Sequence, residues 1–208
     1  MITYSVYTVD HADELVRLLS EVFVHGDPPA MAVDLTASEF QSFVKLLCPR
    51  AATDGLTIIA RDAATGEMVG ALLSEDASAP APQGMDQLSP KFAPIFDILD
   101  ELVAEYRANR PPPSGECAHL FLLGVSARHT GRGIARQLIA TCLAQAVAKG
   151  YRVAVTEATN TTSQHVFARH GFEERVRRSY QQHRFNGRSY FASIADQGGP
   201  MLMERRLP

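Results

Sequence analysis

The sequence predicts an α+β fold in which helices flank a β-sheet. Strand-like and helix-like stretches alternate along its 208 residues. Two apolar stretches, 56–61 and 68–73, flank a short turn at 63–66, which is typical of an antiparallel hairpin. A continuous apolar run over 117–125 is typical of a strand that is covered on both faces. A basic, glycine-containing turn follows that run and leads into a strong helical pattern from residue 133.

Helix-capping residues and prolines indicate where the other predicted helices begin and end. Asp10 is a plausible N-cap for a helix that ends near Phe23, because Pro28 and Pro29 make the following segment incompatible with helix. Thr36 begins a capping-box signature. The predicted strands are 2–9, 56–61, 68–73, 117–125, 152–156, 172–180 and 201–206. The predicted helices are 10–23, 37–47, 91–109, 133–149 and 161–170.

We expect a single domain over residues 1–208, with 74–115 as a loop and helix inserted between strands. The stretch 74–90 has the composition of a mobile loop. The helix that follows it is expected to end at 110–115, where three prolines stand in a row. Asn186-Gly187 predicts a turn before the last strand.

Composition excludes several classes of protein. The chain is 46% hydrophobic and 21% charged, with a net charge of −3, which is typical of a globular protein rather than a nucleic-acid binder. Its three cysteines and seven histidines form no metal-ligand spacing, so we expect no metal. Residues 2–7 resemble a strand rather than a leader, and no apolar run approaches the roughly 20 residues that span a bilayer. We therefore expect a cytoplasmic monomer or homodimer without a membrane partner.

The turn after 117–125 has the features of an anion site. A strand, a glycine turn and a helix N-terminus in that order direct successive backbone N–H groups at one point. Gly133 is followed by Ile134 and Ala135 rather than Lys-Ser/Thr, which excludes a Walker loop. Arg136 occupies the position where a dinucleotide fingerprint needs glycine or alanine, which excludes that motif as well.

The spacing of Arg128, Gly131 and Gly133 resembles the acetyl-CoA pyrophosphate loop of the GNAT superfamily of acyl-CoA N-acyltransferases. A second signature, Asn160-x-x-Ser163-x-x-x-Phe167-x-x-x-Gly-Phe, is similar to a later motif of that superfamily. The resemblance implies a mixed, mostly antiparallel sheet in α/β/α layers, with a central strand that is splayed at the acetyl-CoA site. The residues expected to bind acetyl-CoA are Leu123, Gly124, Val125, Arg128, His129, Thr130, Gly131, Arg132, Gly133, Ile134, Ala135, Asn160, Ser163 and Phe167.

The segment from Phe23 to Pro29 is similar to the Phe-x-x-x-Glu-Pro segment of the insect-type arylalkylamine N-acetyltransferases. The resemblance places Asp27 where those enzymes have a catalytic glutamate, so Asp27 is our first candidate for a general base. Glu116 is the second candidate, because other GNAT branches place a base near the start of the central strand, and His119 is a third. Asp27 can equally be a turn residue, Glu116 a solvated surface residue and His119 a structural residue.

Phe167 stands where many GNAT enzymes have a tyrosine that protonates the leaving thiolate. Thr159 and Ser163 match serines that the arylalkylamine branch uses instead, although Thr159 can equally cap the helix and Ser163 can be a first-turn residue with no role. Gly124 can ease the splay of the central strand or simply relieve packing. The candidate catalytic residues are therefore Asp27, Ser163, Thr159 and Glu116.

The resemblance implies an N-acetyltransferase that moves an acetyl group from acetyl-CoA to a small-molecule amine by direct attack on the thioester. Because Phe167 has no proton to give, a catalytically silent CoA-binding module is an alternative. A protein or peptide acetyltransferase is another. The sequence does not name the acceptor.

Overall fold

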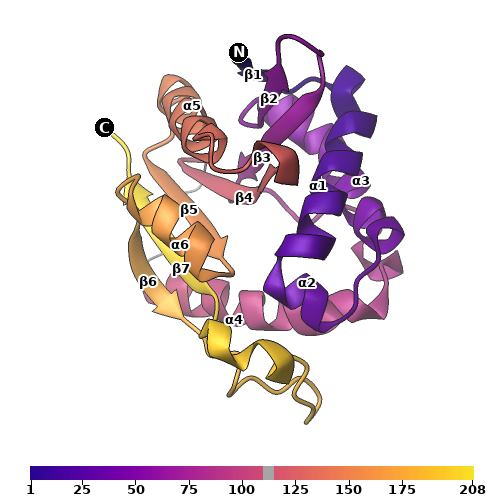
Figure 1. Ribbon diagram of the computed structural model, residues 1–208. Coiled ribbons are helices and arrows are strands. Elements are labelled where there is room, and N and C mark those ends of the chain that lie inside the picture. Colours follow the sequence, from indigo (N-terminus) through magenta and orange to yellow (C-terminus); the bar gives the residue numbers. More distant parts are fainter. Residues whose placement is uncertain (110–114) are drawn as a thin grey trace.

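The computed structural model describes residues 1–109 and 115–208. Seven strands form one sheet in the order β1-β2-β3-β4-β5-β7-β6, in which β4 and β5 are the parallel neighbours and the other pairs are antiparallel. This confirms the expected mixed, mostly antiparallel sheet (Figure 1). The strands are β1 Ile2–Val6, β2 Ile58–Asp62, β3 Met68–Asp76, β4 Cys117–Val125, β5 Val153–Ala158, β6 Glu173–Arg177 and β7 Met201–Arg206.

Helices cover both faces of the sheet. They are α1 Ala12–Gly26, α2 Pro28–Ala32, α3 Ala37–Asp54, α4 Ala93–Asn109, α5 Ile134–Ala148 and α6 Thr161–Ala168. Ile59 and Leu73 point to the face that α1, α3 and α4 cover, whereas their neighbours Ile58 and Leu72 point to the face of α5 and α6. This alternation follows from the two-residue period of a strand and gives the sheet a core on each side. Within the described residues, no helix has the length and apolar character to cross a membrane.

The central strands part at the middle of the sheet. β4 pairs with β5 over Cys117–His119 and Val153–Val155, and beyond that point β4 continues with β3 alone. A register shift between β3 and β4 leaves Phe121 as the extra residue of a bulge. The expected splayed strand is therefore present, and it exposes the β5-facing backbone of β4 toward Val125.

Gly124 is not the source of this irregularity, because it pairs in register with Ala71. A Cβ atom at Gly124 would lie 2.9 Å from Leu19 Cδ2 and 3.4 Å from Val22 Cγ1. Glycine at this position therefore lets α1 approach β4 closely, which decides between the two interpretations of Gly124 in favour of packing.

Several predicted boundaries were wrong near prolines. α1 continues to Gly26, and Pro28 and Pro29 begin α2 rather than prevent a helix, because the first helical turn needs no proline N–H. α3 has the predicted Thr36–Glu39 capping box but continues past Pro49 to Asp54. β6 ends at Arg177, not at residue 180. α4 extends to Asn109, as predicted, and of the stop predicted at 110–115, residues 110–114 lie outside the described residues.

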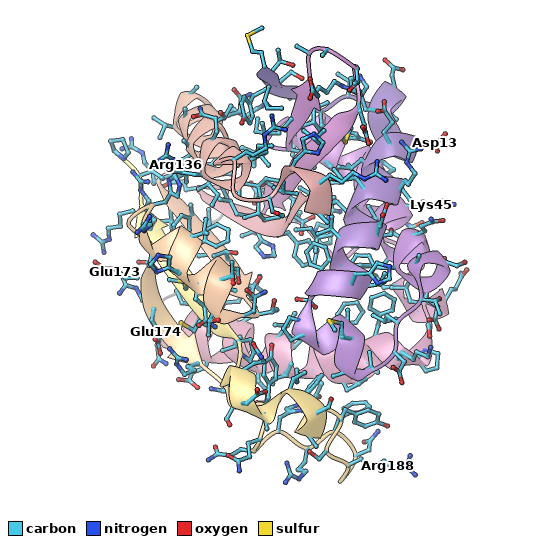
Figure 2. All side chains as sticks on the ribbon, in the orientation of Figure 1. Asp13, Lys45, Arg136, Glu173, Glu174 and Arg188 are labelled. Carbon is cyan, nitrogen blue, oxygen red and sulfur yellow. The ribbon has the colours of Figure 1, made fainter. Side chains whose placement is uncertain are left out.

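The segment between β6 and β7, residues 178–200, packs beside α2. Its short 3-10 helix, Ala192–Gln197, contacts α2, and Figure 1 shows it in yellow at the lower end of the molecule. Tyr180 and Phe191 are fully buried there, with ring centroids 5.3 Å apart. Asn186 and Gly187 both have positive φ angles, which confirms the predicted turn; Arg188, labelled in Figure 2, follows them. We name residues 178–200 the C-terminal segment.

Candidate active site

A cavity with an empty volume of about 920 Å³ opens where β4 and β5 part. In Figures 1 and 2 its position lies between α1 and α6, both of which line it. The walls are mostly apolar and include seven phenylalanines, and several of the rings contact one another, as Phe43 and Phe92 do at a centroid distance of 5.2 Å. The phenylalanines that line it are Phe23, Phe40, Phe43, Phe92, Phe96, Phe121 and Phe167.

Asp27 is a buried carboxylate in the wall of this cavity. It is the N-cap of α2 and is 9% exposed. Its Oδ1 accepts the Thr159 hydroxyl at 2.5 Å, and its Oδ2 accepts the Ala30 N–H at 3.2 Å. Burial raises the pKa of Asp27 to about 6, although both hydrogen bonds act to lower it. The carboxylate is therefore mostly ionised at pH 7 and has a pKa suited to accepting a proton.

Asn160, Ser163 and Phe167 also line the cavity. Asn160 caps α6: its Oδ1 accepts the Ser163 N–H at 2.8 Å, and the Ser163 hydroxyl donates to the Asn160 carbonyl at 2.9 Å. The Ser163 hydroxyl is thus engaged in a helix cap while it borders the cavity. Phe167 packs edge-on against Phe172 and offers no proton at the position of the GNAT tyrosine.

The structure does not place Glu116 with these groups. Its side chain is exposed at the start of β4 and is not among the residues that line the cavity. Its backbone carbonyl instead accepts the N–H groups of Arg152 and Val153, which holds the start of β5. The position of a residue along a strand does not by itself indicate which way its side chain faces, so the sequence alone could not make this distinction.

A buried ion pair in the same cavity was not predicted. Glu157, from β5, lines the cavity, and its Oε2 lies 2.5 Å from Nε2 of His119 on β4. His119 Nδ1 lies 3.6 Å from Glu75 Oε1, and its ring stacks on Phe121 with centroids 4.8 Å apart. A glutamate as the one charged residue of a mostly apolar strand was the available signal, but its partner is 38 residues away.

This pair determines what His119 can do. Burial acts to lower the His119 pKa, but the charge and hydrogen bond of Glu157, with help from Glu75, raise it to about 10. Burial acts to raise the Glu157 pKa, and the charge and hydrogen bond of His119 lower it overall. His119 is therefore protonated at neutral pH and cannot serve there as a general base.

The loop after β4 forms an open cradle at the N-terminus of α5. Gly131 and Gly133 have φ angles of +74° and +75°, which glycine adopts without strain, and an added Cβ on either would meet no atom within 4 Å. Gly133 is the N-cap of α5 and supplies no side-chain cap bond. Arg128 and Arg132 are exposed beside it. Backbone donors, a helix N-terminus and two arginines suit a phosphate group.

The other predicted loop residues have varied surroundings. The Thr130 hydroxyl donates to the Ala127 carbonyl at 3.1 Å within the turn. His129 Nε2 lies 3.9 Å from Asp62 Oδ2. Ile134 is buried in the core under α5, and Ala135 is partly exposed. The side chains of Ile134 and Ala135 carry no polar group, so these two residues can bind a phosphate only through their backbone N–H groups.

The β5-facing edge of β4 is suited to an extended ligand. Over 120–125 this strand pairs with β3 and not with β5, so Leu123 and Val125 border backbone that β5 does not cover. An amide-containing chain that ran along this edge would connect the glycine loop to the cavity. The residues present thus fit a ligand with a phosphate at one end and a pantetheine-like arm.

The fold and this site define an acyltransferase of the GNAT type. The family model "Acetyltransferase (GNAT) family" matches residues 30–172, and the chain belongs to this family. Solved structures agree on the fold. The chain is similar to the C-terminal condensation domain of Ebony in complex with beta-alanyl-dopamine, at 14% identity over 100% of this chain and 99% of that one, with a TM-score of 0.90.

Two further structures share the fold. Arylalkylamine N-acetyltransferase 2 from Aedes aegypti is 20% identical over 100% of this chain and 99% of that one, with a TM-score of 0.86. A polyamine N-acetyltransferase of Drosophila melanogaster is 17% identical over the full length of both chains, with a TM-score of 0.81. The prediction of a GNAT fold is thereby confirmed, and an arylalkylamine N-acetyltransferase is among the structures that share this fold.

Proposed function

We propose that the protein transfers an acetyl group from acetyl-CoA to the primary amine of a small, largely apolar molecule, such as an arylalkylamine. The observation that carries this proposal is the position of Asp27. A carboxylate with a pKa of about 6 stands in the wall of an aromatic cavity, beside the point where the central strands part. The membership of this chain in the GNAT family agrees with acetyl transfer.

In this proposal acetyl-CoA lies along β4. The backbone N–H groups from Arg128 to Ile134 hold its pyrophosphate, with Arg128 and Arg132 as charge partners. The exposed edge beside Leu123 and Val125 receives the pantetheine amides. The thioester then reaches the cavity, which Asn160, Ser163 and Phe167 also border.

Asp27 supplies the base. An alkylamine has a pKa of about 10 and is protonated at pH 7, so it must lose a proton before it attacks. The apolar walls disfavour the ammonium form, which brings the two pKa values closer together. Asp27 accepts one proton from the ammonium group, and the nitrogen lone pair then forms the C–N bond with the thioester carbonyl carbon. The C–S bond breaks with its electron pair going to sulfur, and the second proton that the nitrogen loses goes to the departing thiolate or to solvent.

The cavity favours a cation with one charge. Neither lysine nor arginine is among its lining residues, whereas Asp27 and Glu157 are. His119 already balances the charge of Glu157, so Asp27 is left to meet the ammonium group. The seven phenylalanines provide no carboxylate for a second charged end, which favours an aromatic monoamine over a polyamine.

Thiol release from acetyl-CoA tests the proposal on a panel of 2-phenylethylamine, tyramine, spermidine and a short peptide with a free N-terminus. We expect turnover with the two arylalkylamines and little with spermidine. Turnover on the peptide alone would replace the proposal with peptide acetylation. Binding of acetyl-CoA without turnover on any member would instead favour a silent module. That alternative is kept because Phe167 and the engaged Ser163 hydroxyl leave no evident proton donor.

A further inference from the structure

We propose that Tyr180, in the C-terminal segment, is a positioning residue that holds the Thr159 hydroxyl against Asp27 and so keeps Asp27 available as a proton acceptor. The catalytic part of this inference rests on the proposed function. The structural part concerns the free protein and can be tested without any turnover.

Three distant segments meet in one chain of hydrogen bonds. The Tyr180 hydroxyl donates to the Thr159 carbonyl at 2.7 Å, and the Thr159 hydroxyl donates to Asp27 Oδ1 at 2.5 Å. Thr159 follows Ala158, the last residue of β5, so no strand partner fixes its backbone. The contact with Tyr180 holds its peptide group in the orientation that directs the hydroxyl at Asp27.

Tyr180 is itself firmly held. It is fully buried, its N–H donates to the Gly198 carbonyl at 3.0 Å, and its ring packs on Phe191. Gln164 connects the C-terminal segment to the end of β5 a second time, because its Nε2 donates to the carbonyls of Ala158, at 3.2 Å, and Gly199, at 2.9 Å. The C-terminal segment thus supports the end of β5 from Tyr180 and from Gly199.

The electrostatic surroundings of Asp27 agree with this role. Burial first, and then the charge of Asp27, raise the Tyr180 pKa, so the phenol stays protonated and acts as a donor at any working pH. Among the described residues that face the cavity, Glu157 of β5 is the other titratable side chain, and α1 contributes Val22, Phe23 and Gly26. The helices α3 and α4 contribute only apolar side chains. The Thr159 hydroxyl is therefore the side-chain donor that opposes the rise of the Asp27 pKa through burial.

Removal of the Tyr180 hydroxyl should loosen Thr159 and weaken its hydrogen bond to Asp27. The carboxylate would then titrate at a higher pH, and less of it would be ionised near neutrality. For Tyr180→Phe we expect kcat/KM to fall about fivefold at pH 5, the equivalent of one ordinary hydrogen bond, and about twofold at pH 6.5, and to recover toward the parent value at pH 8.5. The affinity for acetyl-CoA should be unchanged.

The direct measurement is a carbon-13 NMR titration of the Asp27 carboxylate in the free protein, with the resonance assigned by its absence in Asp27→Asn. We expect Tyr180→Phe and Thr159→Val each to raise the titration midpoint, and Thr159→Ser to preserve it. If Tyr180 acts through Thr159, the double variant Tyr180→Phe/Thr159→Val should titrate no higher than Thr159→Val alone. Tyr106→Phe is the matched control, because its hydroxyl is also buried and bonded, to Glu204 Oε2 at 2.6 Å, but its ring packs in another cluster.

Three results would overturn the proposal. The first is that the titration midpoint of the Asp27 carboxylate is the same in Tyr180→Phe as in the parent. The effects of Tyr180→Phe and Thr159→Val could add in full, which would show that Tyr180 acts by another route. Tyr180→Phe could fail to fold while Tyr106→Phe folds, which would make Tyr180 a residue of the core only. If the parent acetylates no amine, the proposed function fails, but the titration still decides the structural part.

Discussion

His119 Nε2 lies 2.5 Å from Glu157 Oε2, and the contact joins β4 to β5 just beyond their last paired residues, His119 and Val155. Both side chains are largely buried, so each charge depends on the other for its stability. Glu157 lines the cavity, so the pair presents to it a carboxylate whose charge His119 balances.

The stability of the protein should depend on pH through this pair. The His119 pKa is about 10 in the folded protein and about 6.5 in an unfolded chain. Its contribution is therefore complete below about pH 6.5 and is lost as the pH rises toward 10. Denaturant unfolding at pH 6.5, 8 and 9.5 should show a decline in the free energy of unfolding that is smaller in Glu157→Gln. Glu116→Gln, which alters an exposed carboxylate, is the control. Equal declines in all three proteins would contradict the prediction.

Asp27→Asn should lower kcat for the best amine by about 10²- to 10⁴-fold at pH 7.5, the usual effect of losing a general base. In the parent, kcat should also fall below about pH 6, as Asp27 becomes protonated. The measurement is a pH–rate profile from pH 5 to 9.5, and Glu116→Gln should follow the parent throughout. A larger loss in Glu116→Gln than in Asp27→Asn would move the base to the start of β4.

Asp27→Asn should also be at least as stable as the parent at pH 7. Burial raises the Asp27 pKa above its value in the unfolded chain. The free energy of unfolding therefore falls as the pH rises from about 4 to about 6, and it stays lower above that range. The asparagine variant lacks this loss. Denaturant unfolding of both proteins at pH 4.5 and 7 measures the difference between their free energies of unfolding. If Asp27→Asn were markedly less stable than the parent at pH 7, burial of the ionised Asp27 would not be unfavourable and the prediction would be wrong.

Ser163→Ala should lower the melting temperature slightly, because the Ser163 hydroxyl accepts the Asn160 N–H in the capping box of α6 and donates to the Asn160 carbonyl, and its loss costs about 1 kcal/mol. Because Ser163 also borders the cavity, kcat should fall about fivefold. Thr162→Ala is the control, since Thr162 is exposed on the same turn. A loss beyond 10³-fold at unchanged acetyl-CoA affinity would instead identify Ser163 as the catalytic acid, within the range known for acid catalysis.

Gly133→Val should abolish measurable binding of acetyl-CoA in calorimetry, because a branched side chain at a φ of +75° strains the loop and stands over the N–H groups of α5. Gly66→Val carries the same strain at a φ of +73° in the β2–β3 turn, and it should bind as the parent does. Equal affinities of Gly133→Val and the parent would show that the loop is not the phosphate site.

The sequence alone determined the elements whose signals are local. Residues 117–125 and 201–206 form strands with the predicted bounds, because their apolar character and adjacent turns are encoded within a few residues. The positive φ angles of Gly131 and Gly133 agree with the predicted glycine turn. Near Pro28 and Pro49 the rule that proline ends a helix gave wrong bounds, because tertiary contacts decide whether a proline begins a helix, interrupts it or lies within it.

Only the tertiary structure decided which candidate residues meet. The sequence placed Asp27 and Glu116 in the same role, but burial puts Asp27 in the cavity and leaves Glu116 in solvent. Thr159 reaches Asp27 across 132 residues, and Glu157 reaches His119 across 38. Such contacts leave no periodic trace in the chain, because they depend on how α1 and the C-terminal segment pack around the end of β5. The pKa of each group depends on that packing too, since burial and the distance to a partner set the energy of a charge.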